Sequence, residues 1–142
     1  MSKGDSGYFS NTSGKGKALI AEVEARGDKI TASEVIGITK TSGGQIIWLE
    51  KGHSSGKPSG LAHIIEKHGN QFNDIGIETN DIADFVLTAV SKGRIVGYQG
   101  KSTTRPVYEV EYNGVIHRVA VTAGSNGYIV GANPSGNGGI EK

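Results

Sequence analysis

The stretch RPVYEVEYNGVIHRVAVTAG, residues 105–124, carries the strongest fold signal in this sequence. Asn113-Gly114 separates two runs of alternating apolar and polar residues, and this pair is typical of a two-residue type I′ turn. Such a turn places Glu109 opposite Arg118, which is a favourable cross-strand ion pair. The same register pairs Tyr112 with Val115, Val110 with His117, and Tyr108 with Val119. The stretch therefore predicts an antiparallel hairpin.

Further strands are expected on both sides of this hairpin. The segments RIVGYQG (94–100) and NGYIVGANP (126–134) are rich in strand formers and are bounded by turn residues. Earlier in the chain, VIGITKTSGGQIIWLEKG (35–52) predicts a second hairpin around its SGG turn.

Three helices are expected before the long run of strands. The clearest is ETNDIADFVLTAVSKG (78–93), with Thr79 or Asn80 as its cap and Gly93 as its end. Its apolar stripe consists of Ile82, Phe85, Val86, Ala89 and Val90. A second covers LAHIIEKH (61–68), with Ser59 as N-cap and Gly69 as the stop, and a short third runs from about Lys17 to Arg26.

Helices followed by an antiparallel meander define an α+β fold, with the helices packed on a sheet of four to five strands. The 142 residues suffice for one domain. We expect residues 1–30 to be a flexible or linker-like lead with a short helix, residues 31–135 to be the functional domain, and residues 136–142 to be a mobile tail.

Composition excludes several classes of function. The chain has no cysteine, so disulfides and thiolate metal sites are absent, and its four histidines are dispersed. It contains no P-loop, dinucleotide-binding, GxSxG or HExxH motif, so we expect no metal and no cofactor. No apolar run approaches a membrane span of about 20 residues, so we expect no membrane partner.

The helix phrase GLAHIIEKHG (60–69) holds two of the four histidines. His63 and Lys67 share one face of this helix, whereas His68 ends the apolar stripe that Leu61 begins. One interpretation is structural: His68 caps the last carbonyls and His63 is solvated. The other is functional, because an imidazole titrates near neutrality and a nearby cation binds phosphate.

A hydroxyl-rich loop, GKSTTRP (100–106), follows the strand of residues 94–100. Its hydroxyls and cations suit contacts to an RNA phosphate, although an ordinary solvated turn would have the same composition. Net charge does not decide between them, since the total is +1; yet residues 92–105 contain four basic residues and no acid.

Four phrases occur in an order that resembles a known family. They are GLAHIIEKHG (60–69), the Phe72…Gly76-Ile77 phrase, VYEVEYNG (107–114) and SNGYIVGANP (125–134). Together they resemble the C-terminal toxin domains of contact-dependent growth inhibition (CdiA-type) proteins. More broadly, they are similar to the nuclease superfamily that joins barnase, EndoU, the tRNase colicins and RelE. The resemblance covers about Val35 to Pro134.

This resemblance implies helices on one side of a four- or five-stranded antiparallel sheet, and ribonuclease activity, often against tRNA. It implies a domain that is delivered as part of a larger secreted or cell-surface protein and that acts in the cytoplasm of the target cell. A cognate immunity protein would block its site, and some relatives use elongation factor Tu as a partner that presents tRNA.

The candidate site residues follow from the resemblance together with the residue types. The expected catalytic set is His63, His68, Lys67, Thr104 and Arg105. The expected substrate-binding set is Lys101, Ser102, Thr103, Tyr108 and Arg118. The leading hypothesis is a metal-independent endoribonuclease that uses the RNA 2′-OH as nucleophile, with either histidine as the base. The alternatives are a non-catalytic module that binds RNA or a translation factor, and a toxin that degrades NAD.

Overall fold

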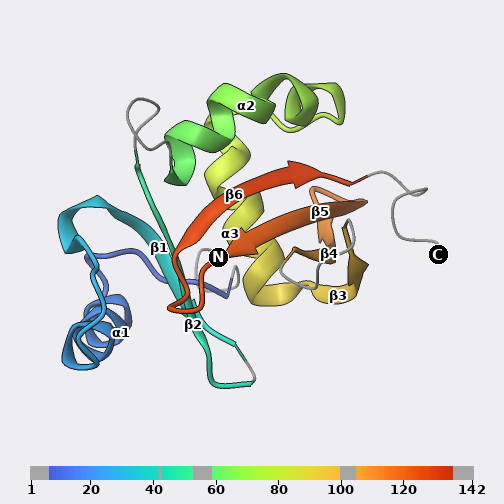
Figure 1. Ribbon diagram of the computed structural model, residues 1–142. Coiled ribbons are helices and arrows are strands. Elements are labelled where there is room, and N and C mark those ends of the chain that lie inside the picture. The colour runs from blue at the N-terminus through green and yellow to red at the C-terminus, as the bar shows by residue number, and fades with distance from the viewer. Residues whose placement is uncertain (1–6, 42, 53–58, 100–104, 136–142) are drawn as a thin grey trace.

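The computed structural model describes residues 7–41, 43–52, 59–99 and 105–135, and within them the chain folds as the predicted α+β arrangement (Figure 1). These residues form two antiparallel sheets. The smaller sheet pairs β1 (Val35–Lys40) with β2 (Ile46–Glu50). The larger has four strands in the consecutive order β3 (Arg94–Tyr98), β4 (Pro106–Tyr112), β5 (Val115–Ala123) and β6 (Ile129–Pro134).

The β4–β5 hairpin has the predicted register. Asn113 and Gly114 both have positive φ, 54° and 83°, as a type I′ turn requires. Tyr112 pairs with Val115, and Glu109 pairs with Arg118. The carboxylate of Glu109 lies 3.0 Å from the guanidinium of Arg118 and 2.9 Å from that of Arg94 on β3. The ion pair therefore spans three neighbouring strands.

Helix α3 (Ile82–Lys92) packs against both sheets and carries the main core. All five residues of its predicted stripe are buried. The predicted caps Thr79 and Asn80 are wrong, because residues 79–81 form a 3-10 turn and the α-helix begins after Asp81. The side chain of Asp81 makes no capping hydrogen bond.

Helix α2 (Gly60–Asp74) is longer than the sequence predicts. Its end at Gly69 is wrong: Gly69 is a buried residue inside the helix, and the chain turns at Gly76, whose φ is +90°. The physical reason is Phe72, which continues the apolar stripe by one more turn and is fully buried. The helix lies along β6, which is an edge strand of the four-stranded sheet (Figure 1).

The described part of the N-terminal lead packs on the smaller sheet. Helix α1 (Gly14–Ala25) begins three residues before the predicted Lys17, because the hydroxyl of Ser13 accepts a hydrogen bond from the backbone of Gly16 at 2.9 Å. Ile20 and Val23 are buried against β1 and β2. The division of the chain at residue 30 stays a prediction, and the predicted tail lies outside the described residues.

The two sheets are joined through Trp48 on β2. Its backbone N–H donates to the carbonyl of Gly127 at 3.0 Å, and its indole packs edge-on against Tyr128 with ring centroids 6.1 Å apart. These contacts hold β2 beside the start of β6. In the described segments, no helix has the length and apolar character needed to cross a membrane.

Candidate functional site

Helix α2 places both predicted histidines beside strand β6. Ile64 and Phe72 anchor the helix in the core, and His63 and His68 are left half-buried at its margin. Gly131 on β6 lies beside His63, since a Cβ there would meet Cδ2 of that ring at 3.7 Å, an ordinary packing distance. The position of the histidines therefore depends on how α2 packs on the sheet.

A small cavity of about 100 Å³ lies between α2 and the sheet, and we call it the histidine cavity. It is lined by His63, His68, Arg105, Thr122, Val130, Gly131, Ala132 and Asn133. Three of the predicted catalytic residues thus meet in one place: His63 and His68 come from α2, and Arg105 comes from the distant segment just before β4.

Arg105 supplies the positive charge of the histidine cavity. Its Nε donates to the hydroxyl of Thr122 at 2.9 Å, and a terminal nitrogen donates to Oε1 of Gln99 at 3.3 Å. No carboxylate lines the cavity, and Arg105 forms no ion pair with any residue that the structure describes. A guanidinium held by neutral partners keeps its full attraction for an anion.

The two imidazoles have different hydrogen-bond environments. Nδ1 of His68 lies 2.9 Å from Oε1 of Gln71. This oxygen accepts from the tautomer that carries the proton on Nδ1, and in that neutral tautomer the lone pair is on Nε2. Nδ1 of His63 is buried and has no hydrogen-bond partner among the described residues. A buried polar atom without a partner needs an explanation, and a catalytic role is one such explanation.

The other predicted residues lie elsewhere. Lys67 is exposed on α2 and does not line the cavity. Tyr108 belongs to the main core, where burial raises the pKa of its phenol. Arg118 pairs with Glu109. The loop residues lie outside the described residues, namely Lys101, Ser102, Thr103 and Thr104.

Thr122 and Asn133 line the cavity although neither was predicted as a site residue. The sequence does contain a signal for Thr122. When the hairpin register is extended by two residues beyond the Val107–Ala120 pair, Arg105 lies opposite Thr122. Asn133 follows from the next pairing, because it lies opposite Ala120 on β6. Both residues are thus found from the strand register, without any sequence motif.

Comparison with known proteins assigns the chain to no family. No protein-family model matches the chain, and no curated protein matches it. Within the described segments, no group of three or more His, Cys, Asp or Glu residues is arranged to hold a metal ion.

Proposed function

We propose that this domain is an endoribonuclease that cleaves RNA, with tRNA the expected substrate, by transesterification at the 2′-OH. The observation that carries the proposal is the histidine cavity itself, where His63, His68 and Arg105 line one space and no carboxylate of the described segments joins them. Two imidazoles and a guanidinium are the groups that this reaction needs: a base, an acid and a partner for the phosphate.

In the proposed reaction, Nε2 of His68 takes the proton from the 2′-OH, and the 2′ oxygen attacks the adjacent phosphorus. The bond between phosphorus and the 5′ oxygen breaks, and His63 in its protonated form gives the 5′ oxygen a proton. The products are a 2′,3′-cyclic phosphate and a free 5′-OH. His68 is the better base because its Nδ1 proton is held by Gln71.

Arg105 stabilises the extra negative charge that builds up on the phosphorane. Its bond to Thr122 fixes the guanidinium before substrate arrives, so little reorganisation is needed during the reaction. Thr104 directly precedes Arg105 and stays a candidate for a further contact to the substrate. The same holds for Lys67 on α2 and for the loop residues Lys101, Ser102 and Thr103.

The biological role that we propose is that of an antibacterial toxin domain, and it rests on the four sequence phrases. On this proposal a larger protein delivers the domain to a target cell, where it acts in the cytoplasm. An immunity protein would cover the histidine cavity in the producing cell. Elongation factor Tu is the expected partner if tRNA is presented as a complex.

The test is to incubate the purified chain with total tRNA in the presence of EDTA and to analyse the RNA on a gel. We expect discrete fragments with 2′,3′-cyclic phosphate and 5′-OH ends. His63→Ala and His68→Ala should each lower the rate by about 10²–10⁴-fold. Arg105→Ala should lower it by roughly 10²–10³-fold, since it removes charge stabilisation.

The matched control is Asn70→Ala, which changes an exposed residue of α2 outside the cavity and should leave the rate unchanged. Circular dichroism would establish that all variants fold. Undiminished cleavage by both histidine variants would refute the proposal. Shifted but intact tRNA would favour a binding module, and loss of added NAD without RNA cleavage would favour an NAD-degrading toxin.

A further inference from the structure

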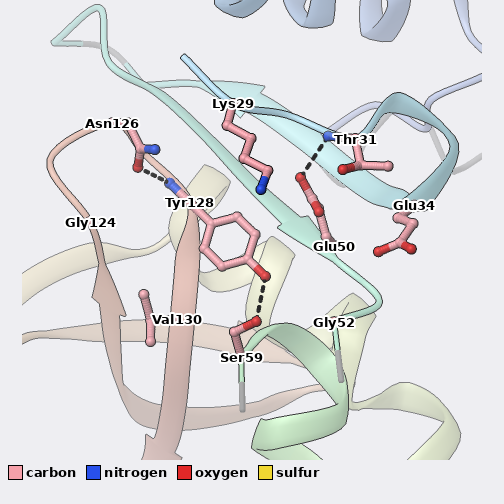
Figure 2. Close-up of a pocket in the computed structure, with 10 residues that line it drawn as sticks. All are labelled: Lys29, Thr31, Glu34, Glu50, Gly52, Ser59, Gly124, Asn126, Tyr128 and Val130. Atoms are coloured by element: carbon pink, nitrogen blue, oxygen red, sulfur yellow. Dashed lines mark hydrogen bonds between the residues drawn. The ribbon is translucent and has the colours of Figure 1, made fainter. Parts of the chain in front are cut away.

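A second and larger cavity of about 480 Å³ adjoins the histidine cavity, and Val130 lines both. We call it the glutamate pocket. Figure 2 shows its walls, which come from the segment before β1, the end of β2, the loop before α2 and the start of β6. Ser59 at its floor directly precedes α2, whose first turns carry His63. The shared residue Val130 and the short chain path from Ser59 to His63 therefore place the two cavities next to each other.

Glu50 is the central polar group of the glutamate pocket. It is only 7% exposed, and its Oε2 accepts hydrogen bonds from Nε1 of Trp48 at 3.0 Å and from the backbone of Thr31 at 3.1 Å. Its other oxygen, Oε1, makes no hydrogen bond to any residue that the structure describes. The two donors fix the carboxylate in place while one oxygen remains free to accept from a ligand.

Lys29 and Tyr128 are two further side chains of the glutamate pocket that could contact a ligand. Figure 2 shows the ammonium of Lys29 and the carboxylate of Glu50 facing the same space, with the ring of Tyr128 beside them. The hydroxyl of Tyr128 bonds to that of Ser59 at 2.9 Å, and its ring packs on Trp48, so the aromatic surface is held still. Aromatic side chains in such positions stack nucleobases.

The two cavities differ in charge. Among the described residues, Arg105 lies in the histidine cavity without a carboxylate, whereas the glutamate pocket has Glu34 and Glu50 with one lysine. A phosphate is attracted to the first and repelled by the second. A planar, uncharged group with N–H donors suits the second, because a carboxylate oxygen is an acceptor only.

We propose that the glutamate pocket binds the base of the nucleotide next to the cleaved phosphate and prefers bases that carry an exocyclic amino group. The amino group of adenine, cytosine or guanine donates to Oε1 of Glu50, and Lys29 donates to an acceptor on the same base. Uracil has no exocyclic amino group. Its one free donor, N3–H, lies between two carbonyl oxygens, so a hydrogen bond from it to Glu50 would bring their lone pairs against the carboxylate. The location beside the cleaved phosphate rests on the proposed ribonuclease function, whereas the preference does not.

The test uses the chain's single tryptophan, Trp48, which contacts both Glu50 and Tyr128. Its fluorescence is followed while the chain is titrated with AMP, CMP, GMP or UMP. We expect UMP to bind about tenfold or more weakly than the other three, which corresponds to the loss of one good polar contact to the base.

Two pocket variants and one control separate binding at a specific site from general electrostatic attraction. Lys29→Met should weaken binding of every nucleotide, while Lys51→Met, a matched change at an exposed lysine outside the pocket, should not. Glu50→Gln should reduce the difference between UMP and the others, since an amide can also donate; isothermal titration would measure this variant independently of Trp48.

Equal affinity for UMP and GMP, or equal behaviour of the two lysine variants, would overturn the pocket proposal. Nucleoside monophosphates contain no bond that the proposed reaction cleaves, so binding and cleavage are measured separately. Selective binding by a chain that cleaves no RNA would leave the pocket standing and refute the ribonuclease. Cleavage without nucleotide binding would do the reverse.

Discussion

At the scale of single residues, the carboxylate of Asp84 is shared by two tyrosines from distant parts of the chain. Tyr8 donates to Oδ1 and Tyr112 donates to Oδ2, the latter at 2.6 Å. Burial, followed by the hydrogen bond to Asp84, raises the pKa of both phenols well above the usual value. The protonated hydroxyls therefore fasten the N-terminal segment and β4 to α3.

This arrangement predicts a loss of stability at alkaline pH. In the unfolded chain both phenols ionise near pH 10, whereas in the folded chain they keep their protons to higher pH. The unfolded state thus binds fewer protons above about pH 10, and the free energy of unfolding falls as pH rises through this range. Denaturant titrations between pH 7 and pH 11 would measure the fall.

Tyr8→Phe and Tyr112→Phe remove the ionising groups, so their stability should depend less on alkaline pH. At pH 7 each should be less stable by about 1 kcal/mol, the contribution of a typical hydrogen bond. Tyr98→Phe, at an exposed tyrosine, is the control and should behave like the original chain. A wild-type slope in both phenylalanine variants would show that Asp84 does not hold the hydroxyls as described.

Part of the histidine cavity could be predicted at this scale. The Asn113-Gly114 turn fixes the register, and the register continued two residues beyond Val107 joins Arg105 to Thr122. The convergence of His63 and His68 could not be predicted in this way. Helical spacing separates them, and they meet at one cavity only because α2 lies at a particular angle along β6.

At the scale of elements, Gly69 shows why the end of α2 was mispredicted. A glycine after an apolar stripe is typical of a helix end, yet here the stripe resumes at Phe72. Gly69 has helical backbone, and an added Cβ would meet its nearest neighbour, Cγ2 of Ile65, at an ordinary 3.5 Å. The tertiary contact of Phe72 outweighs the local signal.

Gly69→Ala should therefore stabilise the protein by about 0.5–1 kcal/mol, because alanine has the better helix propensity and fits the space. Thermal and denaturant unfolding would measure the gain. The matched control is Gly76→Ala, which forces a side chain onto a residue with φ of +90° and should cost about 1–2 kcal/mol. Destabilisation by Gly69→Ala would mean that the helix does end at that residue.

At the scale of the whole molecule, the junction between the sheets decides whether the two cavities stay together. Both hairpins and the consecutive order of the large sheet could be predicted from turn residues and alternation. The junction between the two sheets could not be predicted. It depends on a backbone hydrogen bond from Trp48 to Gly127, and such a bond leaves no pattern in the sequence of side chains. Gly127 has φ of +103°, and a Cβ there would lie 1.9 Å from the carbonyl oxygen of Ile46.

Gly127→Ala should separate the two sheets and cost more than about 2 kcal/mol, since strain at φ and a backbone clash add together. Nucleotide binding in the glutamate pocket should weaken with it, as Glu50 and Tyr128 lie on opposite sides of the junction. Gly27→Ala, also at positive φ but in open space, should cost only about 1–2 kcal/mol. Equal melting temperatures for the two variants would contradict the proposed steric role.

The attachment of the N-terminal segment also has a mechanical consequence. Phe9 and Ile38 exchange two backbone hydrogen bonds of 2.9 Å, and the hydroxyl of Thr39 donates to the carbonyl of Gly7 at 2.9 Å. Among the described residues, a force that pulls on the N-terminal segment acts on these hydrogen bonds and on the Tyr8–Asp84 contact before it acts on α1. A motor or pore that pulls the chain from this side would meet a small, early barrier, while the four-stranded sheet and its cavity would still be intact.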